Sequence, residues 1–130
     1  MELAVSKRLV SVGDHKNIVI VVTNYIEAIK VGNIDMLANA FHKDSVTYGI
    51  VDGELVGGSD NPSAKFIEIN GASPEIEFHI DVLDMSPTTA VVRVVTAKDA
   101  IGSDCNEYLT LIKTNKGWTI ISKVFVQFDK

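Results

Sequence analysis

The stretch that decides the fold runs from Asn106 to Phe128 and reads NEYLTLIKTNKGWTIISKVFVQF. Two runs rich in β-branched and aromatic residues, 108–112 and 118–125, flank the polar and glycine residues of 114–117. A short polar turn between two such runs predicts an antiparallel β-hairpin, with Gly117 at a position of positive φ. We expect Trp118 to be packed rather than exposed, pairing across this hairpin.

Upstream of the hairpin the sequence predicts three helices. After Asp14, a suitable N-cap, apolar residues recur every three or four positions as far as Gly32, which suits a helix C-terminus. Asn33 can cap a shorter second helix, and we expect this helix to end near His42, a cation suited to the negative end of the dipole. Asn61 followed by a proline predicts the start of a third helix.

The hydrophobic period changes from 3.6 to 2 after residue 73, which predicts strands. Residues 76–82 alternate between apolar and polar, and residues 90–97 follow a turn at Ser86-Pro87. A small ribbon that turns at Asp52-Gly53 comes earlier, between the second and third helices. Segregated helices and strands predict an α+β fold, with three N-terminal helices packed on one face of a strongly curved antiparallel β-sheet.

Both faces of the later strands carry apolar residues. In 90–95 and in 120–128 apolar residues occupy odd and even positions alike, whereas an antiparallel sheet with one wet face alternates cleanly. The helices are too few and too short to cover both faces. We therefore expect a second copy of the chain to cover the outer sheet face, giving a homodimer.

Composition bounds the class of protein. The chain has 130 residues, 46% of them hydrophobic, and a net charge of −5, which predicts one domain over residues 1–130, with residues 1–13 as a loose N-terminal arm. Lysines and arginines are scattered singly, so we expect no nucleic-acid partner and no membrane surface. No apolar run reaches roughly 20 residues. With no signal peptide and a single cysteine, Cys105, we expect a cytoplasmic protein.

Residue spacing gives no metal or cofactor site. His15, His42 and His79 show no i, i+4 pairing and no adjoining carboxylate motif, and Cys105 stands alone. The pair Gly57-Gly58 breaks a strand and does not lead into a helix as a phosphate-binding loop does. We therefore expect neither a metal ion nor a cofactor.

Several runs carry a family resemblance. Residues 25–27 (YIE), 31–33 (VGN) and 41–45 (FHKDS), with the helix-then-sheet order, resemble the nuclear transport factor 2-like superfamily of cystatin-like fold. The runs 107–113 (EYLTLIK) and 117–125 (GWTIISKVF) are more narrowly similar to its branch named for lumazine binding. The resemblance covers about residues 15–128 and implies a cone-shaped sheet with a central cavity. The superfamily also holds polyketide cyclases, scytalone dehydratase and steroid isomerase, so it implies no single activity.

Steroid isomerase allows a comparison residue by residue. Tyr25 matches its oxyanion tyrosine, and Glu107 aligns with its second acid. The position of its general-base aspartate falls on Gly49, beside Tyr48. Proton abstraction next to a carbonyl requires a base, so the loss of this aspartate argues against steroid-isomerase chemistry here.

The candidates for a ligand-binding cavity are Tyr25, Tyr48, His79, Asp81, Glu107 and Lys123. Tyr25 lies on the apolar stripe of the first helix, where its hydroxyl is either a pocket group or a core group with an internal partner. An unsatisfied buried polar group costs about 1–3 kcal/mol, so Tyr25 needs a partner such as Glu107, Tyr48, a water or a ligand. His79 and Asp81 are either an acid/base pair or part of a solvated edge strand.

Three hypotheses of function follow from these observations. The leading one is a dimeric domain whose partly apolar cavity binds a small molecule, oriented by Tyr25 and Glu107 with Tyr48 at the mouth. The second is an enzyme of the cyclase, dehydratase or isomerase type, and the third is a protein-interaction module without a ligand. A mainly apolar open cavity favours the first, convergent polar groups favour the second, and a filled cavity favours the third.

Overall fold

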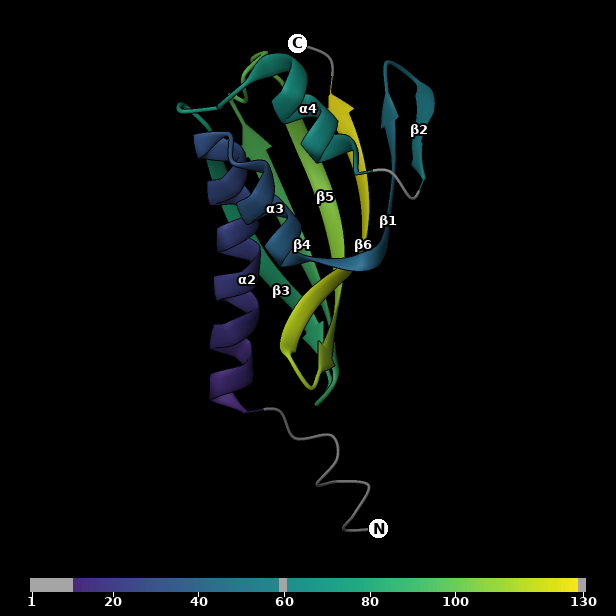
Figure 1. The fold of residues 1–130 in the computed structure, drawn as a ribbon. Helices are drawn as coiled ribbons and strands as arrows, with labels where there is room; N and C mark the ends of the chain where they lie inside the picture. The colour runs from purple at the N-terminus through teal and green to yellow at the C-terminus, as the bar shows by residue number, and fades with distance from the viewer. Residues whose placement is uncertain (1–10, 59–60, 129–130) are drawn as a thin grey trace, which may run out of the picture.

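The computed structural model of the chain describes residues 11–58 and 61–128. Its elements are α2 (Val12–Val31), α3 (Ile34–Ala40), β1 (Phe41–Val51), β2 (Glu54–Gly58), α4 (Pro62–Asn70), β3 (Glu77–Met85), β4 (Thr89–Ala97), β5 (Asp104–Thr114) and β6 (Gly117–Phe128). The helices cover one face of a curved sheet (Figure 1), which confirms the α+β class. None of the helices in these two ranges is long and apolar enough to cross a bilayer.

The sheet has six strands in the order β2-β1-β6-β5-β4-β3. Strands β3 to β6 form the predicted antiparallel meander, and Gly117 has the expected positive φ of 105°. The prediction of a wholly antiparallel sheet is wrong at one pair, because β1 runs parallel to β6, with Tyr48 beside Val124. Parallel neighbours need a long crossover, and all the chain between β1 and β6 supplies it. The sheet is therefore mixed.

Helix α2 begins earlier than the sequence predicts. Ser11 is the N-cap, and its Oγ accepts a hydrogen bond of 2.9 Å from the backbone N–H of Asp14. Asp14 thus lies inside the first turn, where its carboxylate suits the positive helix end, and the prediction that it caps the helix is wrong. Residues 11–13 of the predicted arm belong to the helix and its cap, while residues 1–10 lie outside the described residues. Gly32 ends the helix at φ 73°, as predicted.

The second helix, α3, ends at Ala40, before the predicted end near His42. Phe41 is extended and its ring packs edge-on against Tyr25, with centroids 5.2 Å apart. Strand β1 therefore starts at Phe41, directly after the helix, and includes His42. The Nδ1 atom of His42 accepts a 3.0 Å hydrogen bond from the backbone N–H of Asp44. The expectation that His42 stabilises a helix C-terminus is therefore wrong.

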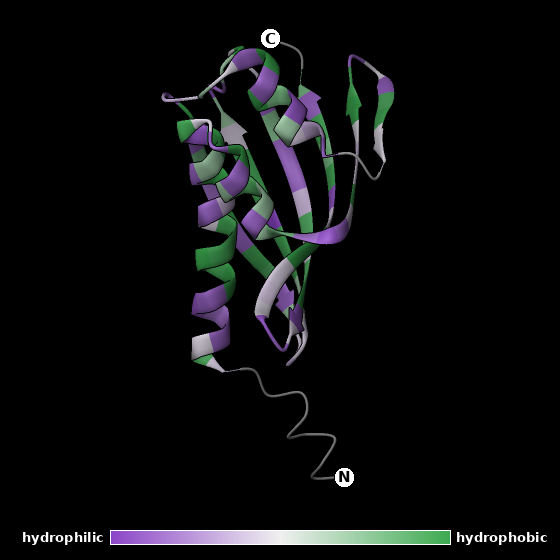
Figure 2. Cartoon of the chain, in the orientation of Figure 1, coloured by the Kyte–Doolittle hydropathy of each residue, from purple (hydrophilic) through white to green (hydrophobic). Residues whose placement is uncertain are grey.

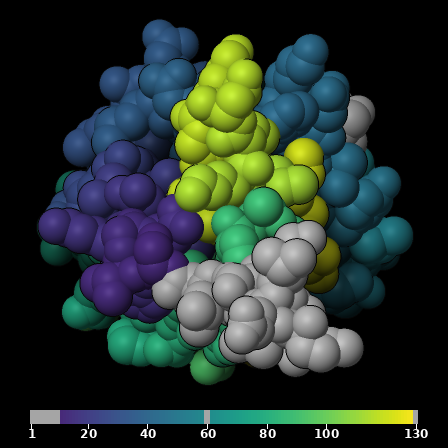
Figure 3. Space-filling model, turned by 90° about the horizontal axis from the view of Figure 1, so that it is seen from below, coloured from purple at the N-terminus to yellow at the C-terminus, as the bar shows by residue number. Residues whose placement is uncertain are grey.

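The core lies between the helices and the inner face of the sheet. Apolar and polar residues alternate around α2 (Figure 2), whose apolar side carries the fully buried Ile18, Val22 and Ile26. At the other end of the chain Trp118 is buried as predicted, with 8% of its surface exposed. Its Nε1 donates to Asp14 Oδ1 over 3.1 Å, so the hairpin docks on the start of α2. Figure 3 shows this contact from below, with the yellow-green hairpin against the purple helix.

The face of the sheet turned away from the helices, here called the outer face, is rich in exposed apolar side chains. Strand β1 contributes three of them, at 39–44% exposure, and strands β4, β5 and β6 contribute the rest. They are Val46, Tyr48, Ile50, Val91, Tyr108, Ile112 and Val124. The structure therefore bears out the sequence pattern in which both strand faces carry apolar residues.

The Asp14 carboxylate provides a test of this docking. Hydrogen bonds from Lys113 Nζ and Trp118 Nε1 lower its pKa below the ordinary value of 3.8. A carboxyl with a lowered folded-state pKa stabilises the fold above its unfolded pKa, and this contribution is lost as the pH falls through the folded pKa. We expect Asp14→Asn to lower the free energy of unfolding at neutral pH, by a difference that shrinks below about pH 4.

Urea unfolding of both proteins across the pH range measures this difference. Asp44→Asn is the matched control, because the Asp44 side chain is 74% exposed, and we expect it to change the free energy of unfolding by less than about 0.5 kcal/mol. A difference between Asp14→Asn and the parent chain that stays constant from neutral to acid pH would contradict the assigned role of the carboxylate.

Candidate functional site

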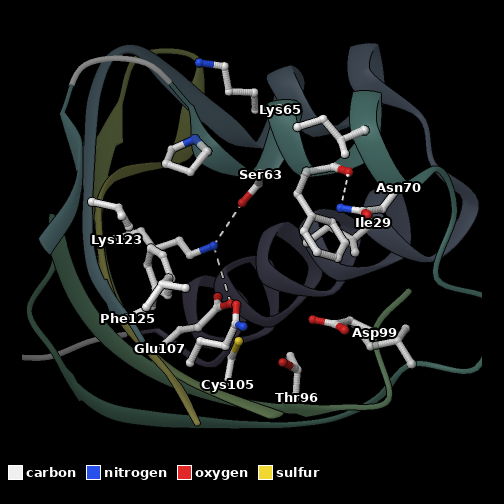
Figure 4. A pocket seen from close by; sticks show the side chains of 17 residues that line it. Ile29, Ser63, Lys65, Asn70, Thr96, Asp99, Cys105, Glu107, Lys123 and Phe125 are labelled. Carbon is white, nitrogen blue, oxygen red and sulfur yellow. Dashed lines mark hydrogen bonds and ion pairs between the residues drawn. The ribbon is translucent and has the colours of Figure 1, made fainter. Parts of the chain in front are cut away.

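A pocket of about 290 Å³ opens between α4, the β1–β2 ribbon and the inner face of β4, β5 and β6. Most of its wall is apolar, and the exposed residues Lys65 and Ile69 mark its rim. Figure 4 shows Lys65 directed away from the interior and Lys123 reaching inward from β6. The complete lining is Ile29, Val51, Val56, Pro62, Ser63, Lys65, Phe66, Ile69, Asn70, Ile76, Thr96, Asp99, Cys105, Glu107, Lys123, Phe125 and Gln127.

The inner end of the pocket holds a buried lysine. Lys123 is 5% exposed, and its Nζ donates to Tyr25 Oη over 2.7 Å and to Ser63 Oγ over 2.9 Å. A third oxygen, Glu107 Oε2, lies 3.4 Å from the same nitrogen. An ammonium carries three N–H donors. The three oxygens around Lys123 Nζ therefore equal its N–H donors in number.

Tyr25 stands behind this end of the pocket. It is fully buried and does not line the cavity, and its hydroxyl donates to Glu107 Oε1 over 2.7 Å. Burial, and next the negative charge of Glu107, hold the pKa of the Tyr25 hydroxyl well above its ordinary value of 10.0. Tyr25 is therefore a neutral donor that fixes the orientation of the Glu107 carboxylate.

Local structure explains why these groups meet. Glu107 and Lys123 point to the inner face from the neighbouring strands β5 and β6, and Lys123 lies opposite Leu109, two residues along β5 from Glu107. Ser63 enters from the first turn of α4, where the Asn61 side chain accepts from its backbone N–H over 3.0 Å. The stripe of α2 supplies Tyr25. Four separate elements thus contribute one polar cluster, here called the Lys123 cluster: Tyr25, Ser63, Glu107 and Lys123.

Two other polar residues of the lining have structural explanations. Asp99 Oδ1 accepts from the backbone N–H groups of Ile101 and Ser103, over 3.1 and 2.8 Å, and so holds the β4–β5 loop. Burial, and next the charge of Glu107, raise the pKa of the Cys105 thiol to about 11. The thiol is thus protonated near neutral pH, and a protonated thiol is a poor nucleophile.

The structure gathers some of the predicted site residues and places others elsewhere. Glu107 and Lys123 line the pocket, with Tyr25 in contact with both. Tyr48 lies on the outer face, 44% exposed, and so does not stand at the mouth. His79 and Asp81 also face outward from edge strand β3, paired over 3.0 Å, with 73% and 43% of their side chains exposed. Successive residues of a strand point to opposite faces of the sheet, and Tyr48, His79 and Asp81 occupy positions that point to the outer face.

The position aligned with the isomerase base is closed to any side chain. A Cβ on Gly49 would overlap the Phe125 ring, which occupies this part of the inner face. Phe125 itself lines the pocket. A carboxylate from this position of β1 is therefore sterically excluded, and the acidic group at the inner end of the pocket comes from β5.

Sequence reasoning missed Ser63 and the apolar wall. Ser63 follows the Asn-Pro pair that predicts α4, so its place in a helix start could be read, but its distance from Lys123 in sequence hides the contact. The wall residues come from helices and strands that only folding brings together. In the part of the chain that the structure describes, no three His, Cys, Asp or Glu side chains gather to hold a metal ion.

Helices over a mixed curved sheet, with a pocket between the layers, define a protein of the nuclear transport factor 2-like class. A crystal structure of such a protein, of unknown function, from Methylobacillus flagellatus is 27% identical, with a TM-score of 0.87, covering 95% of this chain and 98% of that one. Another from Shewanella baltica, also of unknown function, is 26% identical, with a TM-score of 0.85 and coverage of 94% and 99%.

A narrower assignment comes from the sequence comparisons. The model of the family described as "Putative lumazine-binding" matches residues 13–126, and the chain belongs to this family. A curated relative, aldolase FrzH of Cladobotryum sp, is 33% identical over 106 residues, which cover 82% of this chain and 85% of that protein. The family and the fold both agree with the resemblance carried by the sequence.

The buried ion pair makes a strong prediction about stability. Lys123→Met leaves Glu107 buried without its cation, and we expect the free energy of unfolding to fall by roughly 3–5 kcal/mol. Lys98→Met is the matched control, since Lys98 meets Glu77 over 3.0 Å at the surface with both side chains about two-thirds exposed, and it should cost at most about 1 kcal/mol.

Denaturant unfolding of these variants and of the double variant Lys123→Met/Glu107→Gln measures the coupling. We expect the double variant to be more stable than Lys123→Met alone, because it no longer buries an unpaired charge. Equal losses for Lys123→Met and Lys98→Met would contradict the assigned burial of the pair.

Proposed function

We propose that this chain binds a small, uncharged, partly apolar molecule in the pocket, with the polar end of that molecule against the Lys123 cluster. The observation that carries the proposal is an apolar cavity whose inner end is polar but internally charge-balanced. Ligand sites commonly combine an apolar wall with a few convergent polar groups. The volume of about 290 Å³ suits a molecule of one or two rings.

Charge balance supports the choice of an uncharged ligand. Glu107 and Lys123, with 4% and 5% of their surfaces exposed, already neutralise one another. A ligand bringing a net charge to this depth would give up its hydration without an unused countercharge, which is costly. A neutral molecule with a hydrogen-bonding group avoids this cost.

The family description, which names lumazine, supports ligand binding as the role. The open pocket likewise favours a ligand over a protein-interaction module without one. A second candidate function is an enzyme of the aldolase kind. It is favoured by the relative named aldolase FrzH and by a carboxylate, Glu107, held beside a cation in the cavity.

Phenylacetone and phenylacetate are a matched pair of probes, because they are similar in size and differ in charge. We expect phenylacetone to bind, and phenylacetate to bind at least about tenfold more weakly, because its carboxylate must be desolvated near Glu107. Saturation-transfer NMR and calorimetric titration measure both. Equal binding of the two probes would contradict the preference for an uncharged ligand.

Neighbouring residues of β2 provide the matched variants for this test. Val56 lines the pocket, whereas Leu55 is 70% exposed on the other face of the ribbon. We expect Val56→Trp to obstruct the cavity and weaken phenylacetone binding at least about tenfold, and Leu55→Trp to leave it unchanged. Binding that survives Val56→Trp would place the ligand outside this pocket.

We also propose that two copies of the chain associate through the outer face. The exposed apolar residues of β1, β4, β5 and β6 lie on one face of four neighbouring strands, and exposed apolar surface of this kind marks interaction sites. A net charge of −5 on each copy opposes association elsewhere on the surface, but this patch is mainly uncharged. A stable interface here should bury about 1,200–2,000 Å² in total.

Light scattering tests the assembly at micromolar concentration. We expect a mass twice that of the 14.1 kDa chain, and a monomer for Val124→Asp, since a carboxylate at the centre of the patch must be desolvated on association. Ile20→Asp is the control, because Ile20 is exposed on α2, away from the outer face. A monomeric parent chain would contradict the proposal.

A further inference from the structure

The Lys123 cluster has hydrogen-bonding capacity that its internal contacts do not use. The Ser63 hydroxyl accepts from Lys123 and lines the pocket, and a hydroxyl that accepts one hydrogen bond still carries a proton that it can donate. Glu107 Oε1 accepts from Tyr25, while Oε2 makes, among residues 11–58 and 61–128, only the longer 3.4 Å contact to Lys123. The inner end thus presents one hydroxyl donor and one carboxylate oxygen to whatever fills the cavity.

We propose that the pocket enolises an uncharged carbonyl compound. Glu107 Oε2 is the base for the proton on the carbon next to the carbonyl, and the Ser63 hydroxyl donates to the carbonyl oxygen as it gains negative charge. This inference rests on the proposed binding function and adds a reaction to it. Donors aimed at the developing charge in a site shielded from water are the arrangement that stabilises such a transition state.

Glu107 is the carboxylate that the geometry makes available for this step. The other acidic residue of the lining, Asp99, is engaged by two backbone N–H groups of its loop. A base from the β1 position at Gly49 is blocked by the Phe125 ring. Tyr25 holds Oε1, so the carboxylate is fixed with its second oxygen toward Lys123 and the cavity.

Lys123 acts through Ser63 as a positioning residue. Its ammonium donates to Ser63 Oγ over 2.9 Å, and a hydroxyl that accepts a bond from a cation becomes a stronger donor in turn. The lysine Nζ contacts three oxygens, one of them a carboxylate, and the step we propose forms no imine on it. The chemistry we propose is therefore non-covalent.

The step balances without a redox partner. The C–H bond breaks, its proton goes to Glu107 Oε2, and its electron pair moves through the new C=C bond to the carbonyl oxygen, giving an enolate. The enolate carbon can then form a C–C bond to a second carbonyl carbon, whose π electrons go to its oxygen, and Glu107 returns the proton to this alkoxide. The net reaction is an aldol addition, the reaction class named for the relative FrzH.

Hydrogen–deuterium exchange of phenylacetone in D₂O reads out the first step alone, because no second carbonyl is needed. We expect NMR to show loss of the benzylic proton signal faster with the parent chain than in buffer. Glu107→Gln should lower the protein-dependent rate by roughly 10²-fold or more, the usual contribution of a general base. Asp81→Asn, which removes an exposed carboxylate on β3, is the matched control and should leave the rate unchanged.

Ser63→Ala keeps both members of the ion pair and so tests the site if Glu107→Gln folds poorly. We expect it to lower the exchange rate by roughly 10²-fold, as removal of one oxyanion donor does, with little change in phenylacetone affinity. For Lys123, Lys123→Arg should retain exchange and Lys123→Met should lose it, while both still bind the probe. A purely structural role would change affinity and rate together.

The outcomes separate the two proposals. Phenylacetone that binds the parent chain without exchange above the buffer rate overturns enolisation and leaves ligand binding standing. Failure of phenylacetone to bind overturns the proposed function as well. A phenylacetone adduct on Lys123, trapped with borohydride and seen by mass spectrometry, would overturn the non-covalent mechanism.

Discussion

The buried ammonium of Lys123 is the constraint on which the arrangement of this molecule depends. A charge with 5% of its surface exposed is tolerated only when it is surrounded by oxygens, and those oxygens come from α2, α4 and β5. Lys123, on β6, therefore links the helices to the sheet through contacts at a single side-chain nitrogen. It also decides the character of the pocket, because a cavity that ends in a self-neutralised ion pair is polar without being charged.

A second constraint is the close contact between β1 and β6. Gly49 leaves room for the Phe125 ring on the inner face, and this ring fills the space that a side chain at position 49 would occupy. The acidic group at the inner end of the pocket, Glu107, therefore comes from β5. Because the helices and the sheet set only the shape of the cavity, the residues at its inner end decide what the protein does.

The outer face and the inner face of the sheet are both apolar for different reasons. The inner face is covered by helices, whereas the outer face is exposed over β1, β4, β5 and β6. Exposed apolar patches of this kind are uncommon on monomers. Ligand binding and self-association would therefore use opposite faces of one sheet, and substitutions can test them separately.

Local sequence signals predicted most of the fold. The hairpin around Gly117, the helix end at Gly32, the caps at Asn33 and Asn61 and the burial of Trp118 each depend on neighbouring residues, and each is present. Errors arose where distant packing overrides local preference. Phe41 leaves the helix to pack on Tyr25, and Asp14 meets Trp118 and Lys113 across about a hundred residues of chain.

The sequence by itself determined the elements, the apolar character of both sheet faces and the family. Tertiary structure alone decided which polar residues share a site. Tyr48, His79 and Asp81 could not be separated from Glu107 and Lys123 by spacing, because a shift of one residue in a strand exchanges the two faces. Ser63 joins the cluster only because α4 folds over β6. The hydrogen bonds of this cluster join residues 60 to 98 positions apart in sequence and depend on how the layers pack. Sequence periodicity describes only neighbouring residues, so it cannot predict these contacts.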